Sequence, residues 1–171
     1  MIRTGNGIDF HKFSKERKLF LGGLELKEEF GLEGHSDADV LIHSICDSLL
    51  GALAKGDIGD LFPDSDNKWK DTESTYFLLK ILELVDEEGY EILNVDITII
   101  SEKPRISKYK DDIVENLSKI MKLKKDKISL KATTTEKMGF LGREEGMCAI
   151  STVTLMDKKL KKILEDMKNE R

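Results

Sequence analysis

The chain has 171 residues, a length that suits one domain with a substantial core and is too short for two domains of ordinary size. Its residues are 39% hydrophobic and 36% charged, and its formal net charge of -5 gives no electrostatic reason to expect nucleic-acid binding. Both cysteines, Cys46 and Cys148, lie within apolar patterns, and neither a signal peptide nor a transmembrane run is evident, so we expect buried thiols and a cytoplasmic location.

A strand and a hairpin are predicted at the start of the chain. Residues 2–11 alternate loosely between apolar and polar side chains and contain Gly5 and Gly7, which predicts a strand that another segment of backbone approaches closely. Two short apolar segments within residues 19–26 are joined across a pair of glycines, an arrangement that is typical of a hairpin.

The first helix is predicted over residues 39–54, where apolar side chains recur at helical spacing. Ser36 or Asp37 would cap its N-terminus, and His43 would project from the edge of its buried face. Residues 57–66 are rich in turn-forming and acidic residues, so we expect a loop there.

The remainder of the chain alternates between helices and strands. A glycine-rich loop precedes the last strand, and a charged helix with one apolar edge follows residue 157. The spacing of apolar residues predicts helices over residues 73–88 and 106–122 and strands over residues 92–100, 128–135 and 147–156.

This order of elements indicates an α/β sandwich: a mostly four-stranded mixed sheet in a ferredoxin-like layout, with helices on one face and a small N-terminal hairpin. The later strands carry apolar residues in both alternation phases, so both faces of the sheet should be covered, the second by a neighbouring subunit. We expect residues 1–157 to form a single domain and residues 158–171 to be a charged helical extension of it.

Three polar residues suggest a metal site. Asp9 and His11 are one residue apart, so on a strand their side chains project from the same face. Taken alone, they could be a surface carboxylate beside a solvated histidine. His43 would complete a set of one carboxylate and two imidazoles with an open fourth position, which is the pattern of a catalytic metal site. Zinc suits these ligands best, although iron or manganese can use the same set.

Residues in two loops admit two interpretations each. His35 could form local hydrogen bonds in a turn, or it could contact a phosphate, because the unpaired amides and the dipole of a helix N-terminus favour anions. Asp64 and Asp66 could be turn formers or contacts to substrate hydroxyls.

Residues 131–140 form a second polar segment. Its three consecutive threonines could be ordinary β-branched strand residues. Because Glu136 follows them and Lys131 and Lys137 flank them, they could instead bind phosphate oxygens and a phosphate-bound Mg²⁺.

Taken together, these segments make nearly the whole chain, from residue 3 to residue 156, resemble the 2-C-methyl-D-erythritol 2,4-cyclodiphosphate synthase family, the cyclising enzymes of non-mevalonate isoprenoid biosynthesis. Several long motifs occur in the order typical of that family. They are Arg-x-Gly-x-Gly-x-Asp-x-His at residues 3–11, His-Ser-Asp-x-Asp at 35–39 with His43, Asp-Ile-Gly at 57–59, Leu-Phe-Pro-Asp at 61–64, and Lys-Ala-Thr-Thr-Thr-Glu-Lys-x-Gly-Phe at 131–140.

The resemblance implies a metal-dependent intramolecular phosphoryl transfer. The 2-phosphate of 4-diphosphocytidyl-2-C-methyl-D-erythritol 2-phosphate attacks the β-phosphorus and expels CMP, which leaves 2-C-methyl-D-erythritol 2,4-cyclodiphosphate. By position in the motifs, Asp9, His11 and His43 would bind Zn²⁺, Glu136 would bind a Mg²⁺ or Mn²⁺ ion held with the substrate diphosphate, and His35 and Thr134 would stabilise the transition state.

The resemblance also implies a homotrimer with active sites between subunits. The sugar and phosphates would be held by Ser36, Asp57, Ile58, Gly59, Phe62, Pro63, Asp64, Ser65 and Asp66. The cytidine pocket, on the adjacent subunit, would consist of Ser101, Pro104, Arg105, Ile106, Ser107, Ala132, Thr133 and Thr135, while Phe140 and Arg143 would lie near the threefold cavity.

Some positions depart from the family pattern. Arg105 stands where a lysine commonly follows the proline, which keeps the charge and changes its geometry. Ile8 replaces a frequent aromatic residue and Ala38 a frequent glycine.

Two other functions could use the same metal ligands. One is a zinc hydrolase that employs metal-bound water, although no glutamate base stands next to the ligands in the sequence. The other is a non-catalytic oligomeric module whose metal is structural.

Overall fold

The computed structural model describes residues 1–63 and 65–169, so Asp64, a predicted substrate contact, lies outside the described residues. Its strands are β1 (Ile2–Ser14), β2 (Leu19–Leu21), β3 (Leu24–Leu26), β4 (Gly31–Leu32), β5 (Tyr90–Ile100), β6 (Ile128–Thr133) and β7 (Gly146–Asp157). Its α-helices are α1 (Val40–Leu53), α2 (Ile58–Leu61), α3 (Ser74–Glu87), α4 (Lys110–Met121), α5 (Gly139–Gly142) and α6 (Lys158–Asn169).

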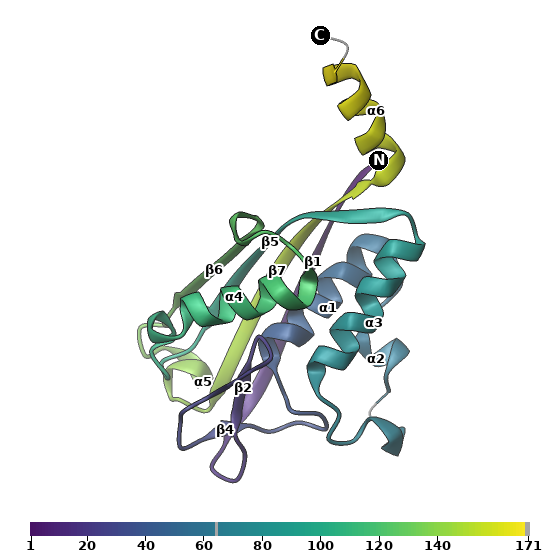
Figure 1. The fold of residues 1–171 in the computed structure, drawn as a ribbon. Coiled ribbons are helices and arrows are strands. Elements are labelled where there is room, and N and C mark those ends of the chain that lie inside the picture. Colours follow the sequence, from purple (N-terminus) through teal and green to yellow (C-terminus); the bar gives the residue numbers. More distant parts are fainter. Residues whose placement is uncertain (64, 170–171) are drawn as a thin grey trace.

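The main layer is a five-stranded mixed sheet in the order β4-β1-β7-β5-β6. Strand β7 pairs antiparallel with β1 and β5, and β5 pairs parallel with β6. Helices α1, α3 and α4 lie over one face of this sheet (Figure 1). The strands β2 and β3 form a separate two-stranded hairpin, as the sequence predicts.

The predicted α/β sandwich is confirmed, and the differences concern short elements. The sheet gains the two-residue strand β4, which is too short to show any alternation in the sequence. Helices α2 and α5 lie inside the two segments that were expected to be loops. The helix expected from residue 106 begins at Lys110, after a 3-10 turn over Ile106–Lys108.

Strand β1 lies directly against helix α1, and its two glycines permit this contact. A Cβ atom added to Gly5 would lie 1.9 Å from the carbonyl oxygen of Ser48, and one added to Gly7 would lie 2.0 Å from that of Ser44. No side chain fits at either position unless the backbones separate. The predicted close approach is therefore confirmed, and it determines how near β1 lies to the helix that carries His43.

The opposite face of the sheet is open in the single chain and carries an apolar cluster on β1. Ile8 and Phe10 of β1 are 50% and 53% exposed. The ring of Phe10 lies 5.9 Å from that of Phe140, which α5 places on the same face. An exposed apolar cluster of this kind is typical of a protein interface.

Helix α6 begins directly after β7 and extends away from the body of the molecule (Figure 1). Its predicted apolar edge is exposed: Ile163, Leu164 and Met167 are 55%, 48% and 56% accessible. Among the residues that the structure describes, no helix combines the length and the apolar character needed to cross a membrane.

Candidate metal centre and adjoining cavity

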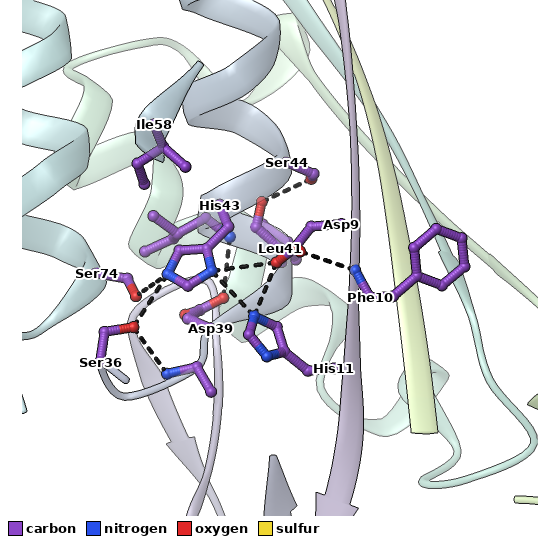
Figure 2. A network of polar contacts seen from close by, with 12 residues as sticks. Asp9, Phe10, His11, Ser36, Asp39, Leu41, His43, Ser44, Ile58 and Ser74 are labelled. Atoms are coloured by element: carbon purple, nitrogen blue, oxygen red, sulfur yellow. Dashed lines mark hydrogen bonds and ion pairs between the residues drawn. The ribbon is translucent and has the colours of Figure 1, made fainter. Parts of the chain in front are cut away.

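Strand β1 and helix α1 bring Asp9, His11 and His43 together, as the sequence predicts (Figure 2). The Asp9 Oδ2 atom lies 2.9 Å from His11 Nε2 and 3.1 Å from His43 Nδ1. The two imidazole nitrogens are themselves 3.1 Å apart. The three atoms therefore form a nearly equilateral triangle that is shielded from most of the solvent, with the side chains between 14% and 24% exposed.

This triangle has the size that a zinc ion requires. Tetrahedral ligands at 2.0–2.1 Å from zinc are separated from one another by about 3.3 Å. The observed separations of 2.9–3.1 Å are close to that value, so small movements of these side chains would admit the ion. One carboxylate and two imidazoles also leave a fourth position for water or substrate. The residues present thus fit a catalytic metal ion.

Hydrogen bonds from other residues orient both imidazoles. His11 Nδ1 lies 2.6 Å from the carbonyl oxygen of Glu33, which can only accept, so Nδ1 carries a proton and Nε2 is the nitrogen that would present its lone pair to a metal ion. His43 Nε2 faces two hydroxyls, Ser74 Oγ at 2.9 Å and Ser36 Oγ at 3.2 Å. Partners of this kind fix the tautomer and the ring orientation of metal-binding histidines.

The charges in the triangle stabilise one another in the metal-free protein. Burial by itself would raise the pKa of Asp9, but hydrogen bonds from His11 and His43 and the charge of these rings lower it below the usual range. Burial by itself would lower the pKa of His11, but the hydrogen bond to Asp9 and its negative charge outweigh that effect and raise it. Asp9 is therefore ionised and ready to bind a cation at neutral pH.

Asp39 anchors the loop that leads into α1. The sequence predicts Ser36 or Asp37 as the cap of this helix, and that prediction is wrong: Asp39 is the N-cap, and its Oδ1 accepts a hydrogen bond from Ile42 N at 3.0 Å. Its carboxylate also accepts bonds from the amides of Gly22 and Gly23, at 3.0 and 2.7 Å. One fully buried carboxylate thus joins the helix to the β2-β3 hairpin.

Asp37 caps a different helix. Its Oδ2 accepts a hydrogen bond at 3.0 Å from the amide of Ser74, the first residue of α3, and its Oδ1 accepts one from the Ser74 hydroxyl. The nominal N-cap of α3, Glu73, makes no such bond through its side chain. Sequence reasoning did not find Ser74, because its partners Asp37 and His43 lie more than thirty positions away in the chain.

A cavity of about 220 Å³ adjoins the triangle. Two of its lining residues, His35 and Trp69, have a buried ring nitrogen without a hydrogen-bond partner among the described residues. Burying such a group without a partner is costly, so a hydrogen bond between either nitrogen and a bound polar group would be favourable. Of the predicted substrate contacts, the cavity is lined by Ser36, Ile58, Gly59 and Phe62; it is also lined by Trp69 and Phe77, which the sequence analysis missed.

Among the described residues of the region 57–66, the predicted contacts Asp57, Pro63, Ser65 and Asp66 do not line this cavity. Asp57 caps α2 by accepting a hydrogen bond from Asp60 N at 3.0 Å, and Asp66 accepts one from Lys68 N at 3.1 Å. These bonds agree with the turn-forming interpretation of Asp66. Pro63 and Ser65 are exposed.

The predicted cytidine pocket gathers at one edge of the sheet. Because β5 and β6 are parallel, their ends meet, and Ser101 N donates to the carbonyl oxygen of Thr133 at 3.0 Å. Arg105 Nε contacts Ser107 Oγ at 3.2 Å, whereas Ile106 is buried. Pro104, Ala132 and Thr135 lie in the same two segments, which contact each other at Ser101 and Thr133 and at Glu102 and Thr135.

The loop after β6 places Thr134 and Glu136 next to each other. Thr134 Oγ1 donates to Glu136 Oε1 at 3.2 Å. The loop is held by Glu102, whose Oε1 accepts bonds from the amides of Thr135 and Lys137 at 2.9 and 3.2 Å. These bonds hold the backbone of Glu136 and Lys137 in the left-handed region, with φ of 53° and 62°.

Within one chain, this loop is remote from the metal centre. Phe10 pairs with Cys148, Cys148 with Ile100, and Ile100 with Thr133, so Phe10 and Thr133 are separated by three strand spacings along one row of the sheet. At 4.7–4.9 Å per spacing this separation is about 14 Å. The structure does not bring Thr134 or Glu136 to the triangle of the same chain.

Phe140 and Arg143 lie beside the open face of the sheet. Phe140 lines a second cavity of about 260 Å³ with Phe10 and Met147. Arg143 is outside that lining, and its Nε donates to Glu145 Oε1 at 2.6 Å.

Comparisons with known proteins agree with this architecture. The model of the YgbB family matches residues 2–156. The chain is 51% identical over 157 residues to the 2-C-methyl-D-erythritol 2,4-cyclodiphosphate synthase of Leptospira interrogans, covering 91% of this chain and 98% of that protein. It is 48% identical over 158 residues to the enzyme of the same name from Bacillus mycoides, covering 92% and 100%.

Solved structures of similar proteins share the fold. The bifunctional IspDF of Campylobacter jejuni superposes with a TM-score of 0.88 at 42% identity, covering 93% of this chain and 44% of that one. A CDP complex of IspF from Plasmodium falciparum superposes with a TM-score of 0.81 at 36% identity, covering 92% and 97%.

Proposed function

Because the chain belongs to the YgbB family, we propose that it is an enzyme that performs the reaction for which its relatives are named. It converts 4-diphosphocytidyl-2-C-methyl-D-erythritol 2-phosphate to 2-C-methyl-D-erythritol 2,4-cyclodiphosphate and CMP, a step of the non-mevalonate isoprenoid pathway. The observation that supports this most directly is the triangle of Asp9, His11 and His43 beside a cavity with unpartnered ring nitrogens.

The reaction needs positioning more than it needs a protein nucleophile. The 2-phosphate oxygen forms a bond to the β-phosphorus, and the bond between that phosphorus and the bridging oxygen of CMP breaks. Both reacting groups are anionic, so the barrier contains their repulsion and the cost of bringing them in line. A Zn²⁺ ion held by Asp9, His11 and His43 would supply Lewis-acid chemistry and neutralise part of this charge.

His35 in the cavity and two residues of the loop after β6 bind and orient the substrate. His35 offers its buried Nε2 atom to a phosphate oxygen, which would satisfy a group that has no partner in the described residues. Thr134 provides a hydroxyl to the transition state, and the adjacent Glu136 would hold a Mg²⁺ or Mn²⁺ ion with the diphosphate. The family sequence pattern and the proximity of these two residues support both assignments.

We assign a homotrimer with active sites between subunits. Two observations support it. Thr133, the residue before Thr134, lies three strand spacings, about 14 Å, from Phe10, which stands between Asp9 and His11 on β1. The open face of the sheet also carries an exposed apolar cluster at Ile8 and Phe10. A neighbouring copy that covers this face would bring the loop bearing Thr134 to the triangle. The cytidine pocket then belongs to the adjacent subunit, in keeping with the CDP complex of the Plasmodium falciparum relative.

A cytoplasmic location accords with the thiol chemistry of the chain. Cys46 and Cys148 are buried and unpaired, and burial raises the pKa of the Cys148 thiol to about 11. Both cysteines are therefore unreactive hydrophobic residues, as is usual in a reducing compartment.

The test is a discontinuous assay for CMP. Purified protein loaded with zinc and supplied with Mg²⁺ should convert the diphosphocytidyl substrate to CMP and cyclodiphosphate in equal amounts. Zero release by fully metallated protein would refute the proposal. The variant Asp9→Ala should lose both bound zinc and activity.

Labelled water separates cyclisation from hydrolysis. In H₂¹⁸O, an intramolecular transfer places no solvent oxygen in the products, whereas a zinc hydrolase would place one label in each turnover. Measuring the mass of both products decides between the two reactions.

A further inference from the structure

His43 has one nitrogen for the metal centre and one for the protein. Its Nδ1 atom faces Asp9 and His11, and its Nε2 atom faces the Ser74 hydroxyl (Figure 2). A neutral imidazole has one donor and one acceptor nitrogen. Binding a cation through Nδ1 therefore requires the proton to reside on Nε2.

The Ser74 hydroxyl oxygen is placed to accept a hydrogen bond from His43 Nε2–H. Its hydroxyl hydrogen is donated to Asp37 Oδ1, and its backbone N–H is donated to Asp37 Oδ2 at 3.0 Å. The lone pairs of Ser74 Oγ then face His43 Nε2 at 2.9 Å. Ser74 is fully buried, so water cannot take its place.

The other hydroxyl near His43 is a weaker partner. Ser36 Oγ lies 3.2 Å from Nε2 and already accepts a bond from the amide of Ala38. It also lines the cavity, where a substrate can compete for it. Ser74 is thus the nearer acceptor and the one fixed by a carboxylate.

We propose that Ser74 and Asp37 are positioning residues that set the tautomer of His43 and thereby the affinity of the metal centre. The three groups come from separate elements: Asp37 from the loop before α1, Ser74 from the first turn of α3, and His43 from α1. The carboxylate polarises the hydroxyl, and the hydroxyl holds the proton of the imidazole on Nε2, which leaves Nδ1 available to bind the ion beside Asp9. The inference rests on the metal site of the proposed function.

The variant Ser74→Ala tests this arrangement through metal binding and through NMR. Zinc affinity, measured by competition with a chromophoric chelator, should fall by about 10- to 100-fold, the range typical for loss of such a partner. In the metal-free protein, the ¹⁵N shifts of neutral His43 should show a larger share of the Nδ1–H tautomer, because Asp9 remains as an acceptor at Nδ1 while the nearer acceptor at Nε2 has been removed. A purely structural role of Ser74 would leave this tautomer ratio unchanged.

Ser48→Ala is the matched control. Ser48 is a buried serine of α1 that donates to the carbonyl oxygen of Ile45 at 2.7 Å and has no contact with His43. Its loss should change neither the zinc affinity nor the tautomer. The proposal is wrong if Ser74→Ala keeps the wild-type tautomer and binds zinc within about twofold of this control.

Asp37→Asn provides a second test that keeps the side-chain volume if Ser74→Ala does not fold. Removing the negative charge weakens the hold on the Ser74 hydroxyl, so zinc affinity and the Nε2–H tautomer should both decrease. Unchanged values for both would overturn the inference. Neither readout uses CMP release, so a protein that binds zinc as expected but forms no cyclodiphosphate would count against the proposed function alone.

Discussion

Asp9 contacts two histidines through a single oxygen atom, and its ionisation controls the metal-free centre. Its Oδ2 atom lies 2.9 Å from His11 and 3.1 Å from His43. Because the pKa of His11 is raised, its contribution to stability is present below the ordinary histidine pKa and is lost as the pH rises through the raised value. Because the pKa of Asp9 is lowered, its own contribution is lost only as the pH falls through that lowered value.

We therefore expect Asp9→Asn to lower the pKa of His11 in the metal-free protein. Without the negative charge, burial is the dominant effect, and it disfavours the imidazolium. An NMR titration of the His11 ring protons measures the shift. The difference in unfolding free energy between wild type and variant should be largest just below the ordinary histidine pKa and should shrink as the pH rises through the raised one.

Asp96→Asn is the control for this titration. Asp96 pairs with Lys131 at an exposed position of the sheet, so its loss should leave His11 unaffected. An unchanged His11 pKa in Asp9→Asn would show that the carboxylate does not interact with the ring as described.

The grouping of the three proposed metal ligands could be predicted from the sequence, whereas the residues that support them could not. Asp9 and His11 are one residue apart on a strand, and His43 lies at the edge of a clear helical pattern, so local periodicity places each of them. Ser74 and Trp69 have no such signal. Their roles come from packing between segments that are distant in the chain, which one sequence without its fold does not reveal.

At the scale of elements, the contact between β1 and α1 sets the geometry of the metal centre. Gly7→Ala should destabilise the protein by about 1–3 kcal/mol, because the new methyl group would overlap the backbone of Ser44 and Ser48 and force the strand from the helix. Denaturant unfolding of the metal-free protein measures this loss. Zinc affinity should also fall, since the strand carries two of the three ligands.

Gly51→Ala is the matched substitution in the same pair of elements. A Cβ atom at Gly51 would lie 3.8 Å from the carbonyl oxygen of Asn6, an ordinary contact, and alanine favours a helix interior by up to about 1 kcal/mol. The unfolding free energy should therefore decrease in Gly7→Ala and increase in Gly51→Ala. A Gly7→Ala variant as stable as wild type would contradict the close packing.

Long elements could be predicted and short ones could not. The strands β5 and β7 and the helices α1 and α3 contain enough residues to show a period, and the sequence placed them to within a few positions. The strand β4 and the helices α2 and α5 contain two to four residues each. The cap of α1 was misassigned because Asp39 also serves the hairpin, a tertiary role that local capping rules do not describe.

At the scale of the whole molecule, helix α6 lies outside the packed body. The family model ends at residue 156, and the contacts of α6 with the body include the exposed ion pair of Lys158 with Asp86 and the partly buried pair of Lys161 with Glu91. A chain truncated after residue 157 should therefore fold, release CMP at the wild-type rate, and melt within about 3 °C of the full chain. Calorimetry and the CMP assay check both expectations.

The full chain with Ile163→Lys is the companion to this truncation, since it keeps the helix and removes part of its apolar edge. This variant should release CMP at the wild-type rate and melt at nearly the wild-type temperature. A large loss of melting temperature in either variant would show that the core domain requires this extension.

The order of strands in the sheet has a genetic consequence for the proposed trimer. If the triangle of one subunit works with the Thr134 and Glu136 loop of its neighbour, two different inactive subunits can complement each other. Co-expressed His43→Ala and Glu136→Ala chains, mixed evenly, should assemble trimers in which about one quarter of the sites have both halves intact. In a mixture of His43→Ala with Asp9→Ala, both defects fall in the triangle. No site in that mixture should have both halves intact, so no activity should be recovered.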